Sequence, residues 1–312
     1  MGFSIASLMN SMFRRSFVSA GLLSDNISVD SDTTIHCWIS ASLPVSNESK
    51  KPDSNTKPVL LLIPGFGTHA IWHWNAQVGP MSRHFDIIVP DLIFFGGSTT
   101  SSSLRSEVFQ AEVFTRLLDV LGVADRDIYI AGTSYGGFVA YHMAQSLGPE
   151  RVKKVVIASS DLLKSEEDDK ELMKRGGVDN LVDLLVPKYT KTLKSLLGLT
   201  TYRAPKFMPE FLLKDIMRYH FKEYTEQKLE LINGLVLDTK DFELTPLQQD
   251  VLVVWGEGDQ IFPVDKAYKV KEKLGDKARL EVLPKTGHIP HQEDSKRFNK
   301  LLLNFLSDTS KP

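Results

Sequence analysis

Cysteine is nearly absent from this sequence, since Cys37 is the only one in 312 residues. A single thiol excludes an internal disulfide framework and a cysteine-based zinc site, and it is typical of a reducing compartment. No segment approaches the roughly 18 consecutive apolar residues of a membrane-spanning helix. The chain also lacks a strong net charge: the formal value is −2 and the pI is about 6.5. Overall electrostatics therefore favour neither nucleic acid nor an anionic membrane as a partner.

What is present is the composition of an ordinary globular protein, with 42% hydrophobic and 24% charged residues. A chain of this length suits one large domain, or a core with an insertion. No internal repeat divides it. We expect neither a cofactor nor a metal ion.

The first 24 residues form a segment of their own. They contain Arg14, Arg15 and several serines, but no acidic residue before Asp25. Their apolar positions follow approximately helical spacing, which predicts an amphipathic helix that packs on the core or contacts a membrane. The same composition is typical of an organelle transit peptide, so targeting is the alternative.

Apolar runs predict a mostly parallel sheet of eight strands with helices on both faces, which is an α/β fold. The opening strands fall within 27–39, and a Pro/Ser/Asn/Lys-rich loop follows at 44–58. The other predicted strands are Val59–Ile63, Ile87–Asp91, Asp127–Ile130, Val155–Ser159, Val251–Trp255 and Leu280–Leu283. Helices are expected at Glu107–Leu121 and Lys296–Leu306. The core is thus assigned to residues 25–162 and 249–312.

Between residues 163 and 248 the alternation of strands and helices stops. The segment is charge-rich and has helical periodicity throughout, with helices expected at 166–174, 181–185, 191–197, 209–220 and 225–234. Because one crossover helix would suffice to join two strands, about 85 residues indicate a helical cap inserted after the sixth strand. Its apolar residues Phe207, Met208, Phe211, Leu212 and Leu213 suggest an apolar chamber beneath it, and packing onto the core is the alternative.

The most informative motif is Gly132-Thr133-Ser134-Tyr135-Gly136, which lies between a predicted strand and a predicted helix. In that context Gly-x-Ser-x-Gly is typical of a nucleophile elbow. Glycines at 132 and 136 remove the Cβ atoms that would collide with the strand and the helix, while the turn holds Ser134 in a strained conformation. We therefore predict that Ser134 is a nucleophile.

A serine hydroxyl needs a base, and the base needs an orienting acid. Asp259 follows the strand ending at Trp255, and His288 follows the last strand behind Gly287. Both lie at strand ends in the order Ser, Asp, His, so they are the predicted acid and base. Among the alternatives, Glu257 could serve as the acid. Asp91 is expected to brace its loop, and His291 to begin the region leading to the last helix.

Two backbone N–H groups are needed to stabilise an oxyanion. The residue after the nucleophile, Tyr135, should supply one of them, and Phe66 in the glycine-flanked loop Gly65-Phe66-Gly67 the other. Trp72, His73 and Trp74 follow in the same loop. Aromatic side chains of this kind occur as often in the hydrophobic core as in the wall of a substrate pocket, so both placements stay open for these three residues.

The motifs Pro64–Gly67, Gly132–Gly137, Trp255–Asp259 and Thr286–His288 resemble those of the α/β-hydrolase fold superfamily. The resemblance spans about residues 30–310 and is greatest to the plant branch that is similar to bacterial meta-cleavage-product hydrolases. It implies the triad Ser134, His288 and Asp259, with Phe66 and Tyr135 as oxyanion donors. Many relatives have His where this chain has Pro64. An arginine of the cap binds the substrate carboxylate in the C–C hydrolases, and Arg175, Arg203 and Arg218 are the candidates here.

The leading hypothesis is a serine hydrolase that cleaves carboxylic esters of small or medium apolar molecules. One alternative is hydrolysis of a C–C bond in a vinylogous diketone. The other is a small-molecule receptor that keeps the triad but turns over slowly or not at all. The partners expected are therefore a small ester or diketone and no nucleic acid, with weak membrane contact through residues 1–24. A cytoplasmic location is expected, with an organelle or a membrane surface as the alternatives.

Overall fold

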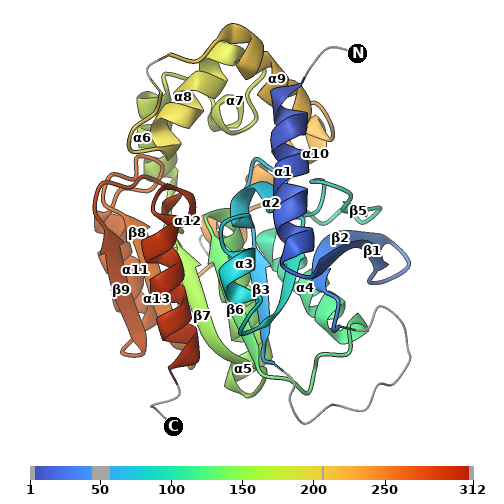
Figure 1. The fold of residues 1–312 in the computed structure, drawn as a ribbon. Coiled ribbons are helices and arrows are strands. Elements are labelled where there is room, and N and C mark those ends of the chain that lie inside the picture. The colour runs from blue at the N-terminus through green and yellow to red at the C-terminus, as the bar shows by residue number, and fades with distance from the viewer. Residues whose placement is uncertain (1–3, 44–56, 206, 240, 309–312) are drawn as a thin grey trace.

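The computed structural model describes residues 4–43, 57–205, 207–239 and 241–308 (Figure 1). The predicted loop at 44–58 lies almost wholly outside the described residues. Within them, nine strands form one sheet in the order β1-β2-β4-β3-β6-β7-β8-β9, with the short β5 paired to β2. The strands are β1 (Leu22–Ser28), β2 (Thr33–Ser40), β3 (Val59–Ile63), β4 (Asp86–Pro90), β5 (Thr99–Thr100), β6 (Ile128–Thr133), β7 (Val152–Ala158), β8 (Asp250–Gly256) and β9 (Ala278–Leu283).

All pairings from β4 to β9 are parallel, whereas β1, β2 and β5 join the sheet antiparallel. The predicted mostly parallel sheet is confirmed. The eight predicted strands become nine because two-residue β5 is too short to leave a pattern. The first strand begins at Leu22, inside the segment predicted to end at residue 24. Only Leu22 and Ile27 of β1 are buried, so this edge strand shows no regular alternation.

Helices cover both faces of the sheet because its central strands are apolar on both. In β3, Leu60 and Leu62 point to one face, while Leu61 and Ile63 point to the other. The first face packs against α1 (Ile5–Ser19), α2 (Ala70–Trp74), α3 (Val78–Met81) and α13 (Ser295–Ser307). The second packs against α4 (Glu107–Val120), α5 (Tyr135–Arg151) and α11 (Asp265–Leu274). The short α12 (Pro290–Glu293) precedes α13.

The stretch between β7 and β8, here called the helical insert (residues 163–248), lies beyond the carboxyl ends of the parallel strands (Figure 1). Its helices are α6 (Glu166–Gly176), α7 (Leu181–Leu185), α8 (Thr190–Thr200), α9 (Glu210–His220), α10 (Thr225–Asn233) and the 3-10 turn η1 (Val236–Asp238). The described residues of the insert contain no strand. All five predicted helices are present, within three residues of the expected bounds.

The predicted N-terminal helix is α1. Phe17 on one side of it is buried against Trp38 of β2, with ring centroids 5.1 Å apart, and Phe13 packs edge-on against Trp72. The helix therefore docks on the core, as the first interpretation of this segment expects. In the part of the chain that the structure describes, no helix has the length and apolar character needed to cross a bilayer.

Candidate active site

Ser134 occupies the sharp turn between β6 and α5. Its backbone has φ 52° and ψ −123°, a strained conformation for a residue with a side chain. A Cβ on Gly132 would collide with the carbonyl oxygen of Gly136, and one on Gly136 would collide with the carbonyl of Pro64. The Ser160 hydroxyl donates to the Ser134 carbonyl at 2.5 Å. Close packing on all sides thus maintains the predicted elbow.

The structure brings the three predicted triad residues together. His288 Nε2 lies 2.9 Å from Ser134 Oγ, and His288 Nδ1 lies 2.9 Å from Asp259 Oδ2. Because a carboxylate can only accept, Nδ1 carries a proton, and Nε2 is the nitrogen placed to accept the proton of the serine hydroxyl. This is the protonation pattern that a general base requires.

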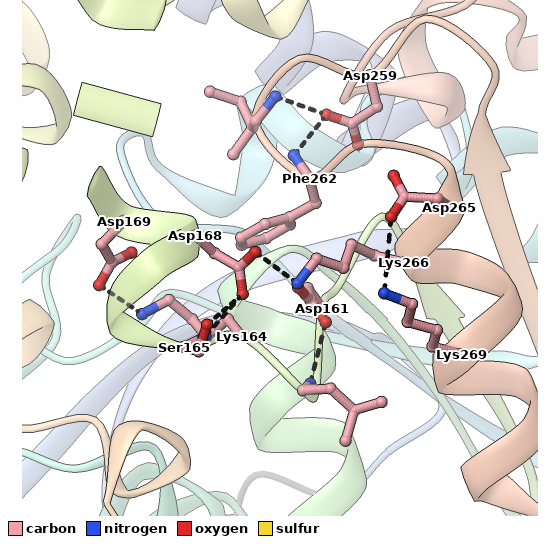
Figure 2. Close-up of polar contacts among 12 residues, drawn as sticks. Asp161, Lys164, Ser165, Asp168, Asp169, Asp259, Phe262, Asp265, Lys266 and Lys269 are labelled. Carbon is pink, nitrogen blue, oxygen red and sulfur yellow. Dashed lines mark hydrogen bonds and ion pairs between the residues drawn. The ribbon is translucent and has the colours of Figure 1, made fainter. Parts of the chain in front are cut away.

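Hydrogen bonds within its own loop orient the Asp259 carboxylate toward the histidine. Its Oδ1 accepts from the backbone N–H groups of Ile261 and Phe262 at 2.9 and 3.0 Å, so Oδ2 is left to face His288. Figure 2 shows this carboxylate bonded to the turn that follows it. The alternative acid, Glu257, instead accepts from the backbone N–H of Lys285 at 3.2 Å. The geometry favours Asp259.

The histidine loop is held by the helical insert and by α12. The His288 N–H donates to the carbonyl of Thr200, the last residue of α8, at 2.9 Å. The Glu293 carboxylate accepts from the N–H groups of Gly287 at 2.5 Å and Tyr202 at 2.9 Å. No local motif marks these contacts, because Thr200 and Glu293 are each tied to a partner far away in the sequence.

The two predicted oxyanion residues flank the serine. Tyr135 is the first residue of α5, so its peptide lies at the positive end of the helix dipole. The loop that carries Phe66 packs against the elbow so closely that a Cβ on Gly65 would lie 3.2 Å from Ser134 Cβ. Their donor role remains a prediction.

Two of the remaining alternatives are placed as expected. Asp91 braces its loop: Oδ1 accepts from Ala70 N at 2.6 Å, and Oδ2 lies 2.6 Å from His36 Nδ1. His291 lies in α12, buried between Trp74 and Phe298 at ring distances of 5.1 and 5.9 Å. Burial holds the pKa of His291 well below its usual range, so it packs as a neutral ring.

A cavity of about 280 Å³ adjoins the triad. Each of the five insert helices contributes an apolar side chain to its wall: Leu172, Leu181, Leu193, Ile216 and Ile232. Trp72 and His73 line the cavity too, whereas Trp74 is buried in the core. Burial lowers the pKa of His73 to about 4, so this ring is neutral at physiological pH.

Of the two readings of the apolar residues at 207–213, packing within the insert applies to Leu213, and none of these residues is among those that line the cavity. Phe207 and Phe211 are 80% and 65% exposed, and Leu213 is buried within the insert. The helical pattern identified α9, but it could not show which side of the helix faces inward. Ile216 and His220, further along α9, reach the cavity instead.

A charged pair also lies on the cavity wall, which the sequence did not reveal. Lys164 Nζ lies 3.0 Å from Asp169 Oδ2, where the chain enters the insert (Figure 2). No arginine is among the described residues that line the cavity. Of the three candidates, Arg175 donates to the carbonyl of Gln260 at 2.9 Å, and Arg203 and Arg218 are on the surface.

With this geometry in place, the chain can be compared with known proteins. The family model described as "alpha/beta hydrolase fold" matches residues 58–295, so the chain belongs to the α/β-hydrolase fold family. The fold and the superfamily predicted from the motifs are confirmed. A plant origin stays a prediction.

Among curated proteins, the chain is 23% identical over 262 residues to the monoacylglycerol lipase ABHD6 of Bos taurus, covering 80% of this chain and 76% of that protein. It is 25% identical over 256 residues to the 2-hydroxy-6-oxo-6-phenylhexa-2,4-dienoate hydrolase of Burkholderia cepacia, covering 78% and 85%. Among solved structures, a putative lipase from Acinetobacter baumannii superposes with a TM-score of 0.74 at 23% identity, covering 98% and 96%. Membership of this family and these relatives identify the chain as a hydrolase.

Proposed function

We propose that this hydrolase cleaves carboxylic esters of apolar molecules, with Ser134 as nucleophile, His288 as base and Asp259 as orienting acid. The observation that carries the proposal is the continuous chain of contacts from Asp259 through His288 to Ser134, with both links at 2.9 Å. That chain adjoins a largely apolar cavity, in which an acyl group would be buried.

In the proposed reaction, Ser134 Oγ attacks the acyl carbon while its proton moves to His288 Nε2. The N–H groups of Phe66 and Tyr135 stabilise the oxygen that becomes negative. His288 then protonates the departing alcohol, which leaves an acyl-enzyme. A water molecule that His288 deprotonates releases the acid and restores Ser134. The helical insert acts in this scheme as a cap that excludes bulk water.

Hydrolysis of a C–C bond is the second candidate, because one relative is a 2-hydroxy-6-oxo-6-phenylhexa-2,4-dienoate hydrolase. Such a substrate carries a carboxylate. Lys164 is the cation on the cavity wall, and it is already paired with Asp169. The absence of arginine from the described lining supports the ester.

The test combines labelling by a fluorophosphonate with hydrolysis of p-nitrophenyl esters of increasing chain length. We expect the wild type to be labelled and active, and Ser134→Ala to lose both. Ser146→Ala is the matched control, because this exposed serine lies on α5, the helix that follows Ser134, and its hydroxyl bonds only the carbonyl of Met143 in the described structure. A folded wild type that neither labels nor turns over would refute the proposal. Faster turnover of a 2-hydroxy-6-oxo-dienoate than of any ester would favour C–C hydrolysis.

A further inference from the structure

The exposed apolar side chains of this protein are unevenly distributed. Four of the large ones that the structure describes lie on α1 and five in the helical insert, against four on the rest of the chain. Those on α1 and in the insert are Leu8, Met9, Met12, Val18, Tyr189, Tyr202, Phe207, Phe211 and Tyr224. Single exposed apolar residues are ordinary, but a concentration of them on one part of the surface marks an interaction site.

Several of these side chains belong to elements that touch one another. Tyr189 and Phe211 adjoin a hydrogen bond from the Thr190 hydroxyl to Glu210, 2.9 Å long, that joins the starts of α8 and α9. One turn along α9, the Asp215 carboxylate accepts from Ala6 N of α1 at 2.8 Å. Leu8 follows two residues later. Figure 1 shows α8, α9 and the start of α1 together at the end of the molecule away from the sheet.

Helix α1 is bound on its inner side and open on its outer side. Ala6 and Phe17 are buried, and Asn10 accepts from the indole N–H of Trp72 at 3.1 Å. Leu8 and Met12 are one helical turn apart and are 49% and 56% exposed. The helix thus has a second apolar stripe that no described residue covers.

The charges around these side chains have one predominant sign, although the whole chain has a net charge near zero. Residues 4–24 hold two arginines and no acid, and the described residues of 184–209 hold four lysines and arginines and no acid. On α9, Glu210 is paired with Lys214 at 3.6 Å. Apolar and aromatic side chains flanked by unopposed basic residues are typical of a protein surface that binds anionic lipid.

We propose that the outer face of α1, α8 and α9 binds the surface of an anionic bilayer. This face, here called the lipid face, carries the exposed side chains Leu8, Met12, Tyr189 and Phe211. The inner sides of the same insert helices line the cavity through Leu193, Leu197 and Ile216. Binding would therefore place the cavity beside the lipid from which an apolar substrate comes. The lipid face is defined without reference to the bond that is cleaved, so it stands apart from the proposed function.

The test is co-sedimentation of the full-length protein with vesicles of phosphatidylcholine, with and without about 30% phosphatidylglycerol. We expect binding to the anionic vesicles that weakens as salt is added. Phe211→Asp and the double change Leu8→Asp with Met12→Asp should each lower the partition coefficient about tenfold or more. Val120→Asp is the matched control, because Val120 is equally exposed but lies on α4 of the core.

Hydrolysis of a short soluble ester serves as the folding check, because none of the substituted residues lines the cavity. The variants Phe211→Asp and Leu8→Asp with Met12→Asp should retain hydrolysis of the soluble ester while their binding to anionic vesicles falls. Failure of the wild type to bind anionic vesicles would overturn the proposal, as would equal losses in the Val120→Asp control. It would also be overturned if these variants abolished a dimer and left vesicle binding unchanged, since the face would then bind a second copy.

Discussion

Removal of the Lys266 ammonium tests how the helical insert is fastened to the core. Lys266 Nζ lies 3.3 Å from Asp161 Oδ2 and 2.5 Å from Asp168 Oδ1 (Figure 2). Asp161 lies just after β7, Asp168 on α6 of the insert and Lys266 on α11 of the core. One cation on α11 therefore joins the loop after β7 and the first helix of the insert, which are neighbours in the chain, to a helix far away in the sequence.

The expected cost of Lys266→Met follows from burial. The Asp161 side chain is only 1% exposed, and loss of the cation would leave this buried carboxylate with the hydrogen bond from Leu163 N–H to Oδ1, 3.0 Å long, but without a counter-charge at Oδ2. Breaking a buried ion pair from one side costs about 3–5 kcal/mol. We expect Lys266→Met to lower the free energy of unfolding by about 3 kcal/mol near neutral pH. This is the lower end of the range, because the partly exposed Asp168 carboxylate can be solvated by water once the cation is removed.

The pH dependence gives the sharper criterion. Burial raises the pKa of Asp161, and the Lys266 charge opposes that shift, so the pKa rises further in the variant. A carboxyl group whose pKa is higher in the folded state than in the unfolded state favours folding increasingly as the pH falls through the folded value. The difference in stability between variant and wild type should therefore shrink as the pH falls from 7 and Asp161 takes up a proton.

Urea denaturation followed by tryptophan fluorescence measures both effects. Adding Asp161→Asn to Lys266→Met should recover most of the loss, because the buried charge is then gone as well. Lys269→Met is the control, since Lys269 is an exposed neighbour on the same helix, 4.0 Å from Asp265. A deficit below about 1 kcal/mol, or one independent of pH, would refute the reasoning.

Three further predictions concern the site. Asp259→Asn should lower kcat about 10⁴-fold by favouring the wrong histidine tautomer, whereas Glu257→Gln should stay within about twofold; steady-state kinetics on one ester compares them. Gly132→Ala should prevent recovery of folded protein, because its Cβ meets the backbone of Gly136, and a variant that melts like the wild type would contradict this. Leu193→Trp should shorten the preferred acyl chain by filling the cavity, and an unchanged chain-length profile would show that acyl groups bind elsewhere.

The strands and helices that the sequence located best have short-range causes. The five residues of β3 are apolar and fully buried, and α7 begins at an Asn180 cap that bonds Val182 N, so both have the predicted bounds. The turn at Ser134 and the loops that carry Asp259 and His288 are likewise marked by short motifs at the ends of predicted strands. Ser134, Asp259 and His288 could therefore each be selected from its own loop, and the fold brings the three side chains into contact.

What the sequence did not show depends on contacts between distant segments. Phe211 and Ile216 both belong to the apolar pattern of α9, but only the docked insert decides that Ile216 faces the cavity and Phe211 the solvent. Lys164 and Asp169 both belong to the segment that the sequence shows only to be charge-rich and helical. They line the cavity only because the chain turns back over the site at that point.

The hydrogen bond from His288 N–H to the Thr200 carbonyl has a consequence for engineering. The main chain that carries His288 is held partly by the insert that lines the cavity, and the Glu293 carboxylate accepts from the N–H groups of both Tyr202 and Gly287. In the proposed function, the residues that select the substrate and those that carry out the reaction are therefore structurally linked. A foreign insert transplanted to alter the substrate range would have to bring its own counterpart of residues 200–202, or the histidine loop would lose its support.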